Sequence, residues 1–479
     1  MTTTMPLPFR SACHAAGLLL VPLALAGCAL PRPTPTPEVA VPAAWNAPRP
    51  AEEPAVDPSL PHGGTQAGLA QWWRRLDDPV LAELIDAAER ASPTVAQAAS
   101  RIAQARASRV SAGAALGPTA DATANANRGF QTSLFAVATI AQGTLQASWE
   151  PDVFGGNRAA RDAAQARLEG SQAGWHDARV SVAAETANQL AAWRACRDQL
   201  AVSETDAASR RESARLSGLS TRAGFTAPAD DALARASAAD AGNRLSQQRA
   251  QCEVAVKGLA ALTGLEEGAL RERLARPAGP VPDQLFAIDA LPARVLAQRP
   301  DVQSAARDVV AASADVANAE AQRYPRLTIG GNIGRMYVDE PSLSGSINTW
   351  SFGPVQLQLP LFDGGKRRAN TEAARAKYDE AVAVYRGKVR QAVREVEEAL
   401  VNLQSTADRT GDAEAAVAGY RAAFQGAQAR FDAGLASRIE LEDARRTLLN
   451  ADTTQVNLRR ERMAAWIALY KAAGGGWNE

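Results

Sequence analysis

Two acidic residues near the C-terminal end of the chain are the side chains most suited to an electrostatic role. Glu440 and Asp443 are three positions apart in a helical pattern, so their carboxylates share one helix face. Carboxylates gathered at a narrow passage hold cations and repel anions. A solvated helix face is the alternative, because Glu442, Arg445 and Arg446 are also charged. The pattern therefore indicates either electrostatic selection or an ordinary polar surface.

Catalysis and metal binding are not indicated by the remaining polar residues. The chain has three histidines, and His62 and His176 lack the spacing of metal ligands. The Gly-Gly-Lys-Arg segment at 364–367 lacks the spacing and the Ser/Thr of a phosphate-binding loop, and a strand-to-helix turn explains it better. Lys and Arg (52) balance Asp and Glu (52), so no nucleic-acid partner is implied. We expect a protein that is not an enzyme and binds no cofactor or metal.

The segments that must position the acidic pair belong to a pattern that occurs twice in the chain. Residues 84–264 and residues 291–474 carry the same prolines and glycines in the same order. The matching pairs are Pro93 with Pro300, Pro118 with Pro325, Pro151 with Pro360, Gly155 with Gly364, Gly156 with Gly365, Arg158 with Arg367, Gly224 with Gly434, and Gly264 with Gly474. The offset grows only from 207 to 210 residues. This constancy indicates an internal duplication, in which each copy is incomplete alone.

Each copy begins with helix and then changes to strand. Residues 79–116 read as two helices, the second starting at Pro93. Apolar and polar residues then alternate, which predicts strands at about 119–128 and 143–153 in the first copy and at about 326–336 and 350–362 in the second. Loops are expected at 131–142 and 337–349.

The predicted strands have the length and pattern of a membrane wall. About ten residues suffice to cross a bilayer when the strand is tilted, and Trp350 and Phe352 could belong to an aromatic girdle. A small soluble sheet is the alternative, but no other apolar layer is available to cover it. Four strands cannot close a barrel, and open edges are not tolerated in lipid. A membrane-spanning chain would therefore have to oligomerise.

Long helical hairpins are predicted after each strand pair, at about 157–264 and 366–473, with turns at Gly224 and Gly434. Cys196 and Cys252 are each 28 positions from Gly224, so they would lie at the same height in an antiparallel hairpin. We expect these cysteines to form a disulfide, as secreted proteins with two cysteines usually do. Two buried free thiols are the alternative.

The N-terminus has the features of an export signal. A short apolar run ends in Leu25-Ala26-Gly27-Cys28, which resembles the lipobox of bacterial lipoproteins. We expect residues 1–27 to be a lipoprotein signal peptide, Cys28 to be lipidated, and Pro-rich residues 28–65 to be an extended tether that packs into no core. An ordinary secretory signal is the alternative. Ala29, where an aspartate resembles an inner-membrane retention signal, favours the outer membrane.

Four segments can be compared with a known family: Trp72–Pro79, Leu291–Val302 (Leu-Pro-Ala-Arg-Val-Leu-Ala-Gln-Arg-Pro-Asp-Val), Leu359–Arg367 (Leu-Pro-Leu-Phe-Asp-Gly-Gly-Lys-Arg) and Arg430–Ser437 (Arg-Phe-Asp-Ala-Gly-Leu-Ala-Ser). They resemble the TolC-like outer membrane factor family, in its NodT-type lipoprotein branch that serves tripartite efflux pumps. The resemblance covers essentially the whole mature chain. Its repeats would occupy residues 66–268 and 291–474, separated by a linker at 269–290 and followed by a tail at 475–479.

The resemblance implies a mixed membrane protein that forms a homotrimer. Three chains would contribute four strands each to a twelve-stranded outer-membrane β-barrel, continuous with a long periplasmic α-helical barrel. Such a trimer would be the exit duct of an efflux pump, lipid-anchored in the outer membrane and extending into the periplasm. It would have a periplasmic adaptor protein and an inner-membrane RND transporter as partners. A type I secretion duct and a periplasmic coiled-coil scaffold lipoprotein are the alternatives.

The resemblance also assigns roles to the acidic pair and to the hairpin turns. Glu440 and Asp443 would line the periplasmic aperture. The family commonly has aspartate at the position that Glu440 occupies in this chain. Arg438 would be a partner that locks the closed state. Asp230 and Asp231 are weaker aperture candidates. Gly224 and Gly434 mark the turns expected to dock the adaptor.

Overall fold

The computed structural model describes residues 32–42, 44–47, 73, 78–132, 135–277, 296–340 and 343–475. The predicted signal peptide, Cys28 and nearly all of the predicted tail lie outside the described residues. The chain divides into two compact units. The strand unit comprises Met1–Glu38, Ser100–Gln172 and Ser304–Arg386, and the hairpin unit comprises Val39–Ala99, Ala173–Gln303 and Gly387–Glu479.

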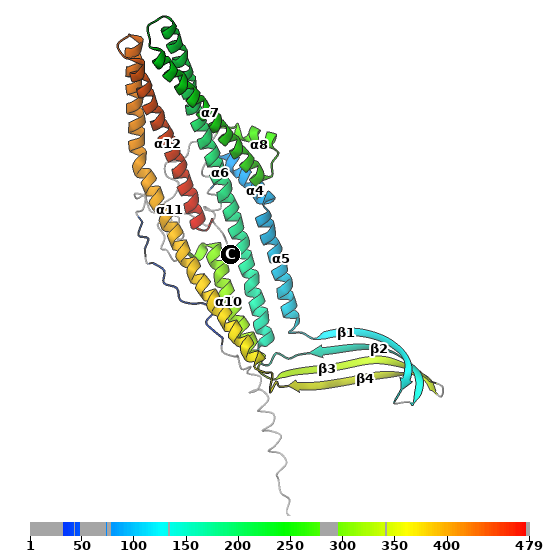
Figure 1. The fold of residues 1–479 in the computed structure, drawn as a ribbon. Coiled ribbons are helices and arrows are strands. Elements are labelled where there is room, and N and C mark those ends of the chain that lie inside the picture. Colours follow the sequence, from blue (N-terminus) through cyan, green and yellow to red (C-terminus); the bar gives the residue numbers. More distant parts are fainter. Residues whose placement is uncertain are drawn as a thin grey trace, which may run out of the picture. The chain divides into compact units, whose positions relative to one another are not determined.

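The strand unit holds one antiparallel sheet of four strands in the order β1-β2-β3-β4 (Figure 1). The strands are β1 (Thr119–Gln131), β2 (Ala136–Trp149), β3 (Arg326–Glu340) and β4 (Leu343–Gln358). The duplication is visible in the sheet, because β1 and β2 come from the first copy and β3 and β4 from the second. Both edge strands, β1 and β4, have a partner on one side only within the described chain.

The loops expected at 131–142 and 337–349 are a wrong prediction, because strand pairing continues through most of both stretches. Arg128 pairs with Thr139, and Tyr337 pairs with Ser346. Ladder hydrogen bonds come from the backbone, so they persist where the apolar alternation fades. The strands also end earlier than expected, at Trp149 and Gln358, since Pro151 and Pro360 have no N–H to donate.

The helices follow the predicted repeat. They are α4 (Pro79–Ala91), α5 (Pro93–Ala114), α6 (Gly156–Arg222), α7 (Pro228–Thr263), α8 (Glu267–Leu274), α10 (Pro300–Ala321), α11 (Lys366–Asp432) and α12 (Arg438–Ala472). Proline stands at the first position of α4 and α7, and Asp78 caps α4 by accepting from the Leu81 N–H. The linker expected at 269–290 instead begins inside α8. Among the described helices, none is long and apolar enough to span a membrane.

The core of the hairpin unit joins both copies of the repeat. Its most deeply buried large side chains are Leu84, Leu190, Leu259, Leu270, Leu400 and Ile467. Arg299, only 4% exposed, lies beside this core. Its guanidinium binds Asp301 at 3.0 Å, Glu395 at 2.7 Å and the Ala472 carbonyl at 3.1 Å. Arg299 thus fixes the start of α10 to α11 and to the end of α12.

The described part of the expected tether packs against the body, which corrects the prediction that it buries nothing. In the hairpin unit, Trp45 is only 7% exposed and belongs to the main core. The N–H groups of Asn46 and Ala47 each donate to a different carboxylate oxygen of Glu397, both at 2.7 Å. One tryptophan and one carboxylate suffice to dock a segment whose overall composition is that of a linker.

Candidate functional site: the turns of the two helical hairpins

The two hairpin turns have the same backbone structure, as the duplication predicts. Gly224 and Gly434 have φ angles of 78° and 73°, a conformation that favours glycine. In each turn, the residue after the glycine donates to a carbonyl in the last turn of the preceding helix. Phe225 N–H binds the Ser220 carbonyl at 2.9 Å, and Leu435 N–H binds the Arg430 carbonyl at 2.8 Å. These bonds end both helices with the same cap.

The predicted aperture acids lie on the first turns of α12, and both are paired with arginines of the same hairpin. Ser437 caps α12 by accepting from the Glu440 N–H at 3.2 Å. The Glu440 carboxylate, 44% exposed, lies 2.6 Å from the Arg430 guanidinium. The Asp443 carboxylate, 57% exposed, lies 2.5 Å from Arg446. The acids are therefore partly neutralised, which the sequence pattern did not reveal.

Arg438 connects the second hairpin to the first. Its guanidinium donates to the backbone carbonyl of Ser213 on α6. It also lies over the Phe431 ring, 5.8 Å from the centroid. Arg438 thus contacts the neighbouring hairpin, while Glu440 and Asp443 have other arginines as their ion-pair partners.

Glu442, one of the charges that made a solvated helix face the alternative, is the second residue of this connection. Its carboxylate accepts from the Ser213 hydroxyl at 2.6 Å and binds Arg445 at 2.9 Å. Its other oxygen is buried and has no hydrogen-bond partner among the described residues. Arg438, Glu442 and Ser213 therefore form one contact between the hairpins, named here the Ser213 latch. No sequence signal marked Ser213, because it is one serine in a helix of 67 residues.

The weaker acidic candidates lie at the start of α7. Asp230 is exposed, and Asp231 binds Arg235 at 3.1 Å. One carboxylate oxygen of Asp231 is buried without a hydrogen-bond partner in the described chain. The described residues contain no group of three or more His, Cys, Asp or Glu that could hold a metal ion.

Cys196 on α6 and Cys252 on α7 are joined by a disulfide in the structure, with 5.6 Å between their Cα atoms. The Gln248 side chain donates to the Cys196 carbonyl at 3.3 Å. The bridge crosses the first hairpin only. Residues at the corresponding positions of the second hairpin are not cysteines.

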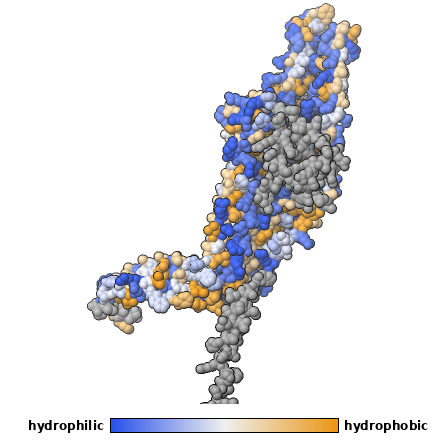
Figure 2. Space-filling model, turned by 180° about the vertical axis from the view of Figure 1, so that it is seen from behind, coloured by the Kyte–Doolittle hydropathy of each residue, from blue (hydrophilic) through white to orange (hydrophobic). Residues whose placement is uncertain are grey.

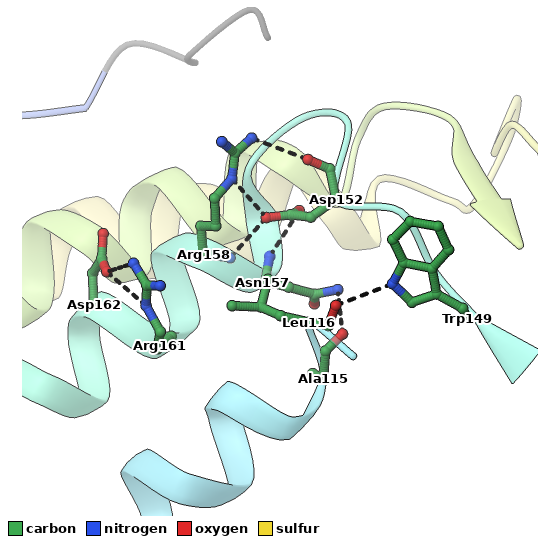
Figure 3. A network of polar contacts seen from close by, with 8 residues as sticks. All are labelled: Ala115, Leu116, Trp149, Asp152, Asn157, Arg158, Arg161 and Asp162. Carbon is green, nitrogen blue, oxygen red and sulfur yellow. Dashed lines mark hydrogen bonds and ion pairs between the residues drawn. The ribbon is translucent and has the colours of Figure 1, made fainter. Parts of the chain in front are cut away.

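The strand-to-helix exits are built by one aspartate and one arginine in each copy, and Figure 3 shows the exit of the first copy. Asp152 accepts from the Arg158 N–H at 2.8 Å and from its side chain at 3.1 Å. In the second copy, Asp363 accepts from the Arg367 N–H at 3.2 Å and from its side chain at 2.9 Å. The Gly-Gly-Lys-Arg segment is therefore a helix-starting turn, as expected.

Apolar residues of neighbouring strands lie opposite one another and form one face of the sheet. Ile333 on β3 pairs with Leu145 on β2 and with Trp350 on β4. Trp350 and Phe352 are 78% and 82% exposed. Hydrophobic patches are visible on the sheet surface (Figure 2). Exposed apolar area of this kind is typical of a surface that faces lipid.

A family model, two sequence relatives and a solved structure all relate the chain to outer-membrane proteins. The family model for "Outer membrane efflux protein" matches residues 84–265 and again residues 291–475. The chain is 29% identical to the pyoverdine export outer membrane protein OpmQ of Pseudomonas putida, over 96% of this chain and 97% of that one. It is 27% identical to nodulation protein T of Rhizobium leguminosarum, over 85% of each chain. The solved outer-membrane channel OprN superposes with a TM-score of 0.78 at 26% identity, covering 92% of this chain and 99% of that one.

These matches confirm the resemblance to the TolC-like outer membrane factors. They also confirm the predicted fold class, with four strands per chain contributing to a trimeric barrel and long helices continuing from it. The chain belongs to the outer membrane efflux protein family and is an outer-membrane exit duct for efflux.

Proposed function

We propose that this chain is the exit duct of a tripartite pump that removes drugs or other small toxic compounds. It would work with a periplasmic adaptor protein and an inner-membrane RND transporter. Cys28 would carry the lipid that anchors the chain in the outer membrane. The observation that carries the proposal is the doubled architecture, in which each copy supplies two strands and one long hairpin.

The open edges of the sheet require closure by several chains, and the family supplies the number three. Backbone groups on the free edges of β1 and β4 need partners in a bilayer. Three chains with four strands each give twelve strands, enough to enclose a lumen. Each β4 would then pair with the β1 of the next copy.

The aperture would lie at the hairpin turns. Glu440 and Asp443 from three copies would form two rings of carboxylates, with Asp230 and Asp231 as weaker contributors. The Ser213 latch would hold the second hairpin against the first in the closed state. Opening would break the contacts of Arg438 and Glu442 with Ser213. The turns at Gly224 and Gly434 would be the docking surface for the adaptor.

The cargo is not specified by this arrangement, because a water-filled duct lined by few specific groups selects weakly. The relative OpmQ is named for pyoverdine export. For this chain, we expect the pump to choose the compound and the duct to pass it. A type I secretion duct would share this structure, whereas a coiled-coil scaffold would form no channel.

Conductance tests the proposal. The purified full chain should run as a heat-modifiable trimer and form channels in planar bilayers. Co-expression with candidate adaptor and RND pairs in an efflux-deficient host should restore drug resistance for one pair. A Cys28→Ala variant should lose labelled palmitate, while the barrel strands should keep the trimer in the membrane. A protein that is monomeric and forms no channels would be a scaffold, and the proposal would be wrong.

A further inference from the structure

The duplication relates contacts inside one chain to contacts between chains. In a closed ring, the first copy of the repeat meets the second within the chain, and the second copy meets the first copy of the next chain. Positions before the strands differ by 207 residues and positions at the strand exits by 209. Contacts seen at the first junction therefore predict contacts at the second, and all those used below lie in the strand unit.

The helices that precede the strands, α5 in the first copy and α10 in the second, differ in burial. In α10, Val309, Ala314 and Val316 are at most 1% exposed. Its counterpart α5 has one buried residue, Ala98, among 22. Both helices are rich in alanine, so composition does not explain the difference. The helix α10 is covered by α6 of the first copy, and α5 lacks the equivalent cover within its own chain.

Close packing between α6 and α10 shows what the missing cover would be. A Cβ atom on Gly156 would lie 2.9 Å from the Cβ of Ala321. The counterparts of these two residues are Gly365 at the start of α11 and Ala114 at the end of α5. A Cβ on Gly365 would meet nothing within 4 Å, and Ala114 is exposed. The start of α11 and the end of α5 thus share the same lack of a partner.

Charge identifies the partner as another copy of this chain. The helix α5 contains Arg101, Arg106 and Arg109 and no acidic residue. None of these arginines has an ion pair within the described residues. On α6, a Cβ at Gly170 would lie 3.8 Å from the carboxylate of Asp308 on α10. The counterparts of this neighbouring pair are Asp379 on α11 and Arg101 on α5, which have opposite charges.

The strand-to-helix exit turns also indicate a contact with another copy of the chain. In the first copy, the Phe154 ring stacks on Tyr324 with 5.0 Å between centroids. In the second copy, the exit turn carries Leu361 and Phe362, which are 88% and 93% exposed. The position that corresponds to Tyr324 is Gly117, in the junction between α5 and β1. At the offset of 209 the counterpart of Phe154 is Asp363, so the two exposed apolar side chains precede the position that is covered in the first copy.

We propose that the exit turn and first turns of α11 of one copy pack on α5 of the next copy. Asp379 pairs with Arg101 of the neighbouring copy, and Phe362 covers the neighbour's α5–β1 junction near Gly117. This inference rests on the trimeric closure proposed above, and it names the residues that make the contact outside the barrel wall.

Charge reversal tests the ion pair. Arg101→Asp and Asp379→Arg should each reduce the fraction of trimer of the full chain in unheated gels and in size-exclusion chromatography with light scattering. The double variant should restore the trimer, because the pair is then reversed. Arg109→Asp combined with Asp379→Arg is the matched control and should not restore it. A wild-type trimer with no restoration in the double variant would overturn the interface and leave closure standing. A monomeric wild type would overturn both.

Cysteine pairs give a test that does not depend on restored assembly. Arg101→Cys with Asp379→Cys should give covalent dimers and trimers on a non-reducing denaturing gel, which reductant collapses to one band. Arg109→Cys with Asp379→Cys should not, because position 109 lies about 12 Å further along the helix at 1.5 Å per residue. Equal cross-linking of both pairs, or cross-linking of neither pair in a trimer, would overturn the proposed register.

Discussion

Arg430 and Glu440 form an ion pair across the Gly434 turn, with 2.6 Å between the guanidinium nitrogen and the carboxylate oxygen. The pair joins the last turn of α11 to the first turn of α12. Arg430 also donates to the Leu435 carbonyl at 3.4 Å, within the turn itself. One arginine therefore shapes the turn and compensates the charge of an aperture candidate.

Removing the arginine should increase the preference of the channel for cations. Arg430→Gln leaves Glu440 without its countercharge. Since an exposed ion pair contributes about 0.2–1 kcal/mol, the cation-to-anion permeability ratio should rise by up to about fivefold. Reversal potentials in planar bilayers under a salt gradient measure this ratio. Glu440→Gln should shift the ratio in the opposite direction.

Arg235→Gln is the matched control for this experiment. Arg235 binds Asp231 in the corresponding part of the first hairpin, at 3.1 Å. Because Asp231 is the weaker aperture candidate, loss of its ion pair with Arg235 should change the permeability ratio less. A larger effect from Arg235→Gln would mean that the acids of the first hairpin line the aperture.

The Cys196–Cys252 bridge should stabilise the first hairpin. It closes a loop with a sequence separation of 56 residues. In the chain-entropy account, a loop of this size contributes about 4 kcal/mol. The Cys196→Ser/Cys252→Ser variant should therefore unfold at lower temperature and exchange backbone amide hydrogens faster in α6 and α7. Reductant should lower the stability of the wild type to that of the variant and leave the variant unchanged. Equal stability of oxidised wild type and variant would contradict this role.

The repeat was readable from the sequence because its landmarks depend on local backbone chemistry. Gly224 and Gly434 stand where φ must be positive, and Pro93 and Pro300 stand where a helix begins. These backbone requirements restrict the residue type at single positions, so they can be recognised in the sequence. The same reasoning failed at 131–142, because backbone pairing between β1 and β2 needs no apolar alternation to continue.

Contacts between distant segments were not readable from the sequence. Trp45 lies in a Pro-rich stretch, and only the position of Glu397 explains why that stretch is docked. The acids of α12 were found from their spacing, but their pairing with Arg430 and Arg446 depends on rotamers and on the turn. The contact of Ser213 with Arg438 joins residues 225 positions apart, which no local pattern encodes.

Neutralising Glu397 should loosen the N-terminal segment. Glu397→Gln retains one acceptor oxygen and loses the charge, so one of the two bonds to residues 46 and 47 is lost. A hydrogen bond to a charged group contributes about 1.5–3 kcal/mol, so amide exchange at Asn46 and Ala47 should become about tenfold faster or more. Hydrogen exchange with mass spectrometry measures this rate. Glu398→Gln is the control, since Glu398 is exposed and pairs with Arg394 at 3.6 Å. Unchanged exchange in Glu397→Gln would show that Trp45 alone holds the segment.

Asp177 and Asp301, two neighbouring carboxylates of the hairpin unit, should respond to pH with opposite signs. Burial raises the pKa of Asp177, and the negative charge of Asp301 raises it further. For Asp301, burial also opposes ionisation, but the hydrogen bond and charge of Arg299 outweigh it and lower the pKa. A raised carboxyl pKa gives stability that is lost as pH rises through the folded-state value. A lowered pKa gives stability that is lost as pH falls through it.

The stability changes caused by neutral substitutions at these two positions should therefore differ in their pH dependence. Asp177→Asn should raise the unfolding temperature at pH 7.5, because the wild type then buries a charge, and the gain should vanish near pH 3. Asp301→Asn should destabilise the protein at pH 7.5 by roughly 1.5–3 kcal/mol, the cost of losing a charged hydrogen bond. That loss should shrink below about pH 4, where free aspartate becomes protonated. Thermal unfolding in detergent at both pH values measures the difference. Shifts of the same sign for both variants at pH 7.5 would show that Arg299 does not distinguish the two carboxylates.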